Sequence, residues 1–249
     1  MRAGFAGLTD DQLRAAGARA GSTHKKGLLT LIAVTAAVAS RVLGLDMFDV
    51  QLRGTLALAR GSIAEMQTGE GKTLAAVPAI AWFARQGNGV HVMTVNDYLA
   101  RRDAAWMGEI YRFLGLTVAH VQQGMTAAER RAAYACDITY ATANEIGFDF
   151  LRDRLALRLE DQVHRPFAAA VIDEADSILI DEARIPLVIA GRESGNSGDS
   201  PWAYAADPVV RNFRVPVQLH RGCRKPQRRP HRPGDRGRGK RLRLRQSVR

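Results

Sequence analysis

The segment Thr68 to Thr73, which reads TGEGKT, constrains the fold of this chain more than any other feature. It follows a short apolar run, SIAEM at residues 62–66, and precedes a helical pattern near residues 72–85. A strand, a glycine-containing loop and a helix in this order form a phosphate-binding loop, because backbone N–H groups and the helix N-terminus together bind phosphate oxygens. The alternative is an ordinary glycine turn before a helix, against which the lysine and threonine at fixed offsets argue.

Several residues of this loop are expected to bind the phosphates and the cation of a nucleotide. Gly69 and Gly71 let the backbone approach a phosphate without a side-chain clash. Lys72 is expected to reach the β and γ phosphates, and the Thr73 hydroxyl to hold Mg²⁺. The common loop pattern begins with glycine, whereas this chain has Met66 at that position. We therefore expect a phosphate loop that departs from the common pattern at one residue.

The chain around this loop alternates β-branched runs with helical patterns. The expected strands are residues 62–66, 89–95, 116–121, 137–142 and 167–173, and the expected helices lie near residues 72–85, 97–114, 126–135 and 144–157. Thr126 and Glu129 are expected to form a capping box for the third of these helices. Such alternation produces parallel strands joined by right-handed crossovers, with helices on both faces of the sheet. The sequence predicts an α/β P-loop NTPase whose ligands bind at the carboxyl ends of the strands.

Two helices are expected before the alternation begins. The first covers Leu8 to Ala20 with Thr9 as its N-cap, and the second covers Gly27 to Leu43. The run from Lys25 to Ser40 also resembles a secretory signal, with two lysines and an apolar stretch. Because a long polar segment precedes this run and it is too short to span a bilayer, we favour a buried helix and a cytoplasmic location.

A second motif, AAVIDEADSILIDEA, places acidic residues at the end of an apolar strand. Asp173 is suited to bind Mg²⁺ through water, and Glu174 to polarise the water that attacks a phosphoryl group. Carboxylates at strand ends also cap helices, but their place in the same sheet as the phosphate loop favours catalysis. ATP is the expected nucleotide, because no Asn-Lys-x-Asp motif for reading guanine follows the acidic cluster.

As an ordered set, these motifs resemble the amino-terminal part of the SecA family of bacterial preprotein translocase ATPases. The matching segments are FDVQLRGTLAL, IAEMQTGEGKTL, VHVMTVNDYLARRDAAWM, DITYATANEIGFDFLRD and VIDEADSILIDEARIPLVIAG. The variants RRDAAWMG and NEIGFD look more like the accessory actinobacterial paralogue than the housekeeping protein. The resemblance implies a RecA-like sheet that works against a second such domain, which closes over the nucleotide and supplies arginine fingers.

The resemblance also implies the site residues. Methionine precedes the loop in this family, so Met66 is the family form, and Gln51 matches the glutamine that contacts the adenine ring. The implied nucleotide-binding residues are Gln51, Met66, Thr68, Gly69, Glu70, Gly71, Lys72 and Thr73. The implied catalytic residues are Glu174 and Lys72, and the implied Mg²⁺ residues are Thr73 and Asp173.

The family further implies partners and a domain order. The partners are preprotein substrates and the membrane Sec channel, met through peripheral association at the cytoplasmic membrane, and no specific nucleic acid is expected. Arg152 and Asp153 match a family motif that we assign to domain coupling and packing. The expected units are an N-terminal helical segment (1–46), a first nucleotide-binding domain (47–191), a linker with the start of a truncated preprotein-binding domain (192–214) and a basic tail (215–249).

The net charge of +11 belongs to the tail. Residues 1–210 carry 21 basic and 24 acidic residues, whereas residues 211–249 carry 15 basic residues and one acid, Asp235. Such a tail suits phosphates or an anionic membrane surface, or it is simply solvated. We favour a third interpretation, a disordered product of out-of-frame translation, because the family resemblance fades beyond Arg214 and the remainder is rich in Arg, Pro and Gly.

Two other functions compete with a protein-export motor. The letters DEAD at residues 173–176 match nucleic-acid helicases, which share the expected sheet, but the flanking segments SILIDEARIPL and NDYLARRD resemble SecA. The other alternative is a nucleotide-binding remnant without turnover, because nothing in this chain corresponds to the second motor domain.

Overall fold

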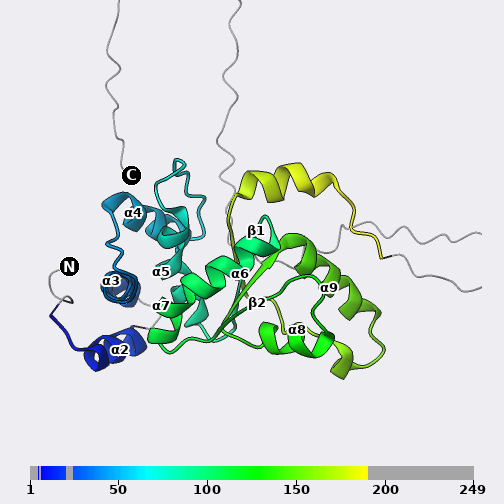
Figure 1. Cartoon of the computed structure of the whole chain (residues 1–249), viewed down its shortest axis with the longest axis horizontal. Coiled ribbons are helices and arrows are strands. Elements are labelled where there is room, and N and C mark those ends of the chain that lie inside the picture. Colours follow the sequence, from blue (N-terminus) through cyan, green and yellow to red (C-terminus); the bar gives the residue numbers. More distant parts are fainter. Residues whose placement is uncertain (1–4, 6, 21–24, 190–249) are drawn as a thin grey trace, which may run out of the picture. The chain divides into compact units, whose positions relative to one another are not determined.

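The computed structural model describes residue 5, residues 7–20 and residues 25–189, which include a four-stranded parallel sheet (Figure 1). The strands are β1 (Val90–Thr94), β2 (Val118–His120), β3 (Ile138–Thr142) and β4 (Ala169–Ile172). Their order in the sheet is β2-β3-β1-β4 and every neighbouring pair is parallel, with Val90 opposite both Ile138 and Ala169. The predicted α/β class and four of the five predicted strands are confirmed.

Helices occupy most of the remaining described chain. The α-helices are α2 (Asp10–Arg19), α3 (Lys25–Leu43), α4 (Asp49–Leu58), α5 (Lys72–Ala84), α6 (Asp97–Trp106), α7 (Gly108–Phe113), α8 (Ala127–Tyr134) and α9 (Ala143–Leu155). Short helical turns follow at Leu159–Asp161, Ser177–Asp181 and Glu182–Arg184. The predicted cap at Thr9 and the predicted capping box of Thr126 with Glu129 are both present, so these two helices begin where the sequence indicated.

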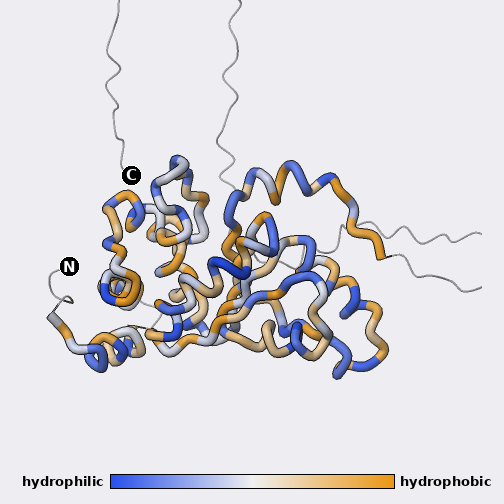
Figure 2. The backbone as a smooth tube through the Cα atoms, in the orientation of Figure 1, coloured by the Kyte–Doolittle hydropathy of each residue, from blue (hydrophilic) through white to orange (hydrophobic). Residues whose placement is uncertain are grey.

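Apolar residues lie on both faces of the sheet. On β1, Val90 and Val92 belong to one hydrophobic cluster and Met93 to another, and successive side chains of a strand point to opposite faces. The helices that contribute to the first cluster are α2, α3, α5, α6 and α7, and the largely hydrophobic α5 can be followed in Figure 2. The helices that contribute to the second cluster are α8 and α9. The predicted placement of helices on both faces is confirmed, and the N-terminal helices share the core of the sheet.

Helix α3 is long and apolar enough to cross a membrane, judged by length and composition alone. The expectation that this run is too short to span a bilayer is therefore wrong. Half of the apolar window from Lys26 to Leu43 is buried in the protein, and Leu31, Val34 and Val38 belong to the first hydrophobic cluster. These contacts are those of a core helix.

Two predictions of secondary structure are wrong. Residues 62–66 are not a strand, because no described strand lies beside them to complete a hydrogen-bonded ladder. The helix predicted over residues 97–114 is interrupted at Met107, next to Gly108, and continues as α7. Glycine has a low helix propensity, which explains a break at that point.

The chain divides into two units, residues 1–218 and 219–249, of which the second lies wholly outside the described residues. The expected linker and basic tail also begin beyond residue 189. The predicted domain boundaries and the nature of the tail therefore stay predictions.

Candidate functional site

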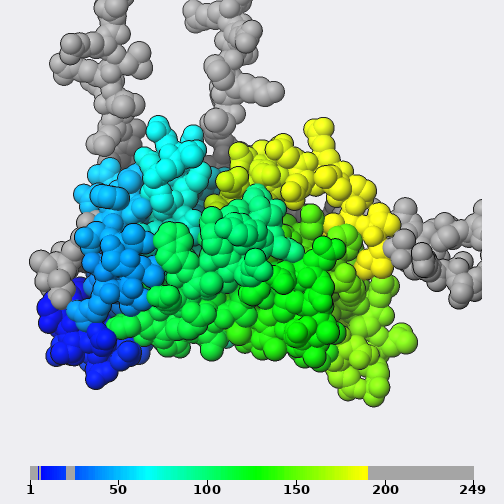
Figure 3. Space-filling view, in the orientation of Figure 1, coloured from blue at the N-terminus to red at the C-terminus, as the bar shows by residue number. Residues whose placement is uncertain are grey.

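The predicted phosphate loop is a tight turn that leads directly into α5. The Glu70 N–H donates to the Gln67 carbonyl at 3.2 Å, and the Gln67 N–H donates to Glu70 Oε2 at 2.8 Å. Gly69 and Gly71 have φ of +89° and +74°, a region that side-chain-bearing residues rarely adopt. Gly71 is the N-cap of α5 and provides no side-chain acceptor, so the first N–H groups of α5 lack a capping side chain. Figure 3 shows this loop, coloured cyan, at the surface beside the blue α4.

Gln51 lies behind the loop and holds it. Its side chain is buried, with 4% of the residue exposed, and both ends of its amide are used. Oε1 accepts from the Phe48 N–H at 2.9 Å, while Nε2 donates to the Glu70 carbonyl at 2.9 Å. A Cβ added to Gly71 would overlap this amide, so glycine is required there for space as well as for backbone angle. The predicted contact of Gln51 with adenine stays a prediction.

The acidic motif follows β4 directly. The Asp173 N–H donates to the Met93 carbonyl of β1 at 2.9 Å, which continues the sheet by one residue. Asp173 Oδ1 then accepts from the Glu174 N–H at 3.1 Å. Glu174 has φ of +53°, the one non-glycine residue with positive φ in the described part of the chain. Such strain is concentrated at functional sites in proteins, and it is a local feature that sequence reasoning missed.

The electrostatics of Asp173 connect the two motifs. Burial raises the pKa of this carboxyl group, and the Glu174 N–H opposes the rise. The charge of Asp103 raises the pKa further, whereas the charges of Lys72 and Arg102 lower it. Lys72 and Asp173 are therefore close enough to interact, although they are far apart in sequence. Asp103, which is 2% exposed and pairs with Arg102 at 2.7 Å, was not anticipated from the sequence.

The chemistry of these groups fits a nucleotide with a divalent cation. The Thr73 hydroxyl and the Asp173 carboxylate offer oxygen ligands, which Mg²⁺ prefers. A Cβ added to Gly69 would have no heavy atom within 4 Å, so the loop is open on that side. Thr68 is exposed on the same loop, whereas Met66 packs against α4. The structure thus brings the loop and the acidic strand end together.

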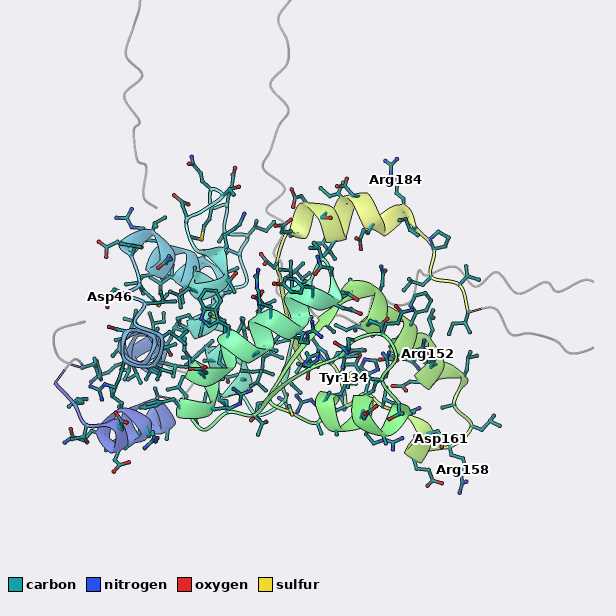
Figure 4. The ribbon with its side chains drawn as sticks, in the orientation of Figure 1. Asp46, Tyr134, Arg152, Arg158, Asp161 and Arg184 are labelled. Carbon is teal, nitrogen blue, oxygen red and sulfur yellow. The ribbon has the colours of Figure 1, made fainter. Side chains whose placement is uncertain are left out.

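The predicted packing motif lies elsewhere, on α9. Asp153 accepts from the backbone N–H groups of Val163 and His164 at 2.8 and 2.9 Å, and Arg152 donates to Asp149 at 2.6 Å. A hollow of about 470 Å³ between α8, α9 and the following turn is lined in part by Asp149, Arg152, Asp153 and Val163, and Arg152 is labelled in Figure 4. Their hydrogen bonds hold the chain together there, which agrees with the packing part of the assignment, while the domain-coupling part stays a prediction.

Comparison with known proteins gives the family. Residues 3–228 match the SecA DEAD-like domain, a match that runs past the expected boundaries at 191 and 214. The protein translocase subunit SecA 1 of Rhodopseudomonas palustris is 55% identical over 192 residues, which are 75% of this chain and 20% of that protein. SecA of Geobacter sulfurreducens is 56% identical over 193 residues, 75% of this chain and 21% of that protein. SecA of Synechococcus elongatus is 61% identical over 160 residues, 64% of this chain and 17% of that protein.

One solved structure aligns with part of the chain. The crystal structure of a hypothetical ATP-dependent RNA helicase from Sulfolobus tokodaii aligns with 60% of this chain and 44% of its own, with 24% identity and a TM-score of 0.44. The chain spans about a fifth of the length of the SecA relatives it matches. Because the family match covers most of its residues, the chain belongs to the SecA DEAD-like domain family.

Proposed function

We propose that this chain is the ATP-binding first motor domain of a SecA-type protein translocase, which drives preprotein export across the bacterial cytoplasmic membrane. One observation carries the proposal: α5, which begins with Lys72 and Thr73, packs against β1 and β4, and the charge of Lys72 lowers the pKa of the Asp173 carboxyl group at the end of β4. An open α/β sheet binds its ligand at the carboxyl ends of its strands, where these groups lie.

In this proposal the loop binds the phosphates of Mg²⁺-ATP. The backbone N–H groups at the start of α5 and the Lys72 ammonium bind phosphate oxygens, and the Thr73 hydroxyl and Asp173 hold the cation. Glu174 orients and polarises the attacking water, and Gln51 reads the adenine ring. The bound nucleotide supplies the free energy of phosphoryl transfer, while these residues provide binding and charge stabilisation.

We expect slow or undetectable turnover by the isolated chain. Its site residues contact one side of the nucleotide, and the resemblance places the arginine fingers on a second motor domain. An arginine finger contributes about 10³ to 10⁵ in rate, so nucleotide binding can persist where hydrolysis is silent. Steady-state ATP hydrolysis that Lys72→Ala abolishes would contradict this expectation.

The partners and location follow from the same proposal. We infer that preproteins and the membrane Sec channel are the partners and that the protein works in the cytoplasm at the membrane surface. The RRDAAWMG and NEIGFD segments support the accessory actinobacterial type of SecA. A nucleic-acid helicase is the competing function, and ATPase activity stimulated by RNA but not by a signal peptide would favour it.

The test is titration of the purified chain with a fluorescent ATP analogue in Mg²⁺. Lys72→Ala removes the ammonium group that binds phosphate, and a charge-assisted hydrogen bond contributes roughly 1.5–3 kcal/mol, so we expect affinity to fall about 10- to 100-fold. Lys26→Ala is the matched control, because Lys26 is exposed on α3 and lies outside both the phosphate loop and the acidic motif. Equal affinity in wild type and Lys72→Ala, or no binding by the wild type, would refute the proposal.

A further inference from the structure

The fully buried residues of helix α4 include no large apolar side chain. Its buried residues are Gln51, Gly54 and Thr55, whose spacing places them on one side of the helix. Gln51 donates to the Glu70 carbonyl in the phosphate loop, and the Thr55 hydroxyl donates to the Ala75 carbonyl in the first turns of α5 at 2.5 Å. Because a polar face gains little from leaving water, its contribution is to fix the backbone groups that it contacts.

The third residue of this face, Gly54, is where Met66 packs. A Cβ added to Gly54 would lie 2.9 Å from Met66 Sδ, closer than real Cβ atoms approach another heavy atom, and 3.9 Å from Met66 Cγ. The thioether therefore occupies the space that a side chain at residue 54 would fill. Met66 lies at the N-terminal end of the phosphate loop. Glu70, whose carbonyl accepts from Gln51, lies near its C-terminal end. Helix α4 thus contacts the loop at both ends.

We propose that Gly54 is a positioning residue of the nucleotide site. Because residue 54 has no side chain, Met66 packs against the backbone of α4. This contact holds the start of the phosphate loop in the conformation that binds phosphate. The inference rests on the proposed nucleotide binding and extends it, because it gives Met66 and α4 a physical role. A glycine at residue 66 offers no side chain by which a neighbouring helix can hold the loop.

Exchange of the two side chains tests this contact in the full 249-residue chain. Gly54→Met places a second thioether in an occupied space and displaces Met66, while Met66→Gly empties the space and releases the loop. The double exchange, Gly54→Met with Met66→Gly, returns one thioether to the contact from the opposite side. Arg53→Met is the matched control, because Arg53 precedes Gly54 on α4 and is exposed.

The readouts are the affinity for a fluorescent ATP analogue in Mg²⁺ and the thermal midpoint of the nucleotide-free chain. We expect each single exchange to weaken binding on the order of 10-fold, or about 1.4 kcal/mol, and the double exchange to recover affinity over Gly54→Met. We expect Arg53→Met to bind as the wild type does. A positioning role weakens binding while the nucleotide-free midpoint stays within a few degrees, whereas a purely structural role lowers the midpoint and leaves affinity unchanged.

The outcomes separate this inference from the function on which it rests. A wild-type chain that binds no analogue refutes the proposed function, and the inference falls with it. A wild-type chain that binds, beside Gly54→Met that folds and binds equally well, overturns the inference alone. If Gly54→Met does not fold, Met66→Gly decides the matter, because that change leaves α4 intact: wild-type affinity in Met66→Gly overturns the inference.

Discussion

The buried ionic network between α8 and α9 offers a quantitative test of the structure. Arg130, whose side chain is 8% exposed, donates from Nη1 to Asp149 at 2.7 Å and pairs through Nη2 with Glu145 at 2.6 Å. It also donates to the carbonyls of Met125 and Gln122 at 3.2 and 3.0 Å. One side chain therefore joins α8, α9 and the turn before α8. We expect Arg130→Met, which keeps most of the volume and removes the charge, to destabilise the chain.

The expected loss of unfolding free energy depends on the hydrogen-bond donors that Asp149 keeps when Arg130 is replaced. Its side chain is 1% exposed, and without Arg130 it retains the Tyr134 hydroxyl at 2.8 Å and Arg152 at 2.6 Å, two residues labelled in Figure 4. Breaking a buried ion pair by removing one partner costs about 3–5 kcal/mol, because a buried charge is left uncompensated. Since Asp149 keeps two donors, we expect the lower end, about 3 kcal/mol of unfolding free energy.

Urea unfolding followed by circular dichroism measures this loss. Arg101→Met is the control, because Arg101 is exposed on α6 and such changes usually alter stability by less than about 0.5 kcal/mol. Adding Asp149→Asn to Arg130→Met removes the orphaned charge and should recover part of the loss. If Arg130→Met and Arg101→Met lose the same small amount, the network does not stabilise the fold and the reasoning fails.

Two further predictions concern buried groups. Burial, with the charges of His164 and Arg165, lowers the pKa of His91 to about 3, so below about pH 6.5 the unfolded chain binds a proton that the folded chain does not. Stability should therefore fall as pH drops through this window, and His91→Phe should remove roughly 2 kcal/mol of the loss between pH 7 and pH 5 in urea titrations; equal pH dependence in both proteins would contradict this. Thr55→Val, which keeps the side-chain volume, should cost about 1 kcal/mol by removing the hydrogen bond to Ala75, and a urea midpoint equal to that of the wild type would show that this bond does not contribute.

The sequence predicts most of the fold because its signals are local. Capping residues such as Thr9 and Thr126 begin their helices as expected, and the alternation of strands and helices gives the parallel sheet. Residues 62–66 have the composition of a strand without becoming one, because a strand exists only through its neighbour and that information is not local. The interruption at Met107 depends on one glycine, whose effect on a long helical pattern is small and easily missed.

Some residues of the candidate site could be predicted from the sequence and others could not, again according to whether their signal is local. Residues that belong to motifs, such as Lys72 and Asp173, are found from the sequence because their chemistry and spacing are specific. Asp103 is not, because its effect on Asp173 depends on where α6 packs. The backbone strain at Glu174 could not be predicted from the sequence either, because a glutamate does not indicate a positive φ.

Glycine within helices is the signal that could have revealed more. Glycine costs roughly 0.5–1 kcal/mol relative to alanine inside a helix, so its presence there calls for a compensating contact. Gly17 of α2 faces Leu114, with 3.1 Å from an added Cβ to Cδ2, Gly54 of α4 faces Met66, and Gly147 of α9 faces Leu187. In each case a side chain from outside the helix occupies the space that a Cβ would fill. In these three helices the glycine therefore marks a close approach by another segment, and in α4 the partner is the residue at which the phosphate loop departs from the common pattern.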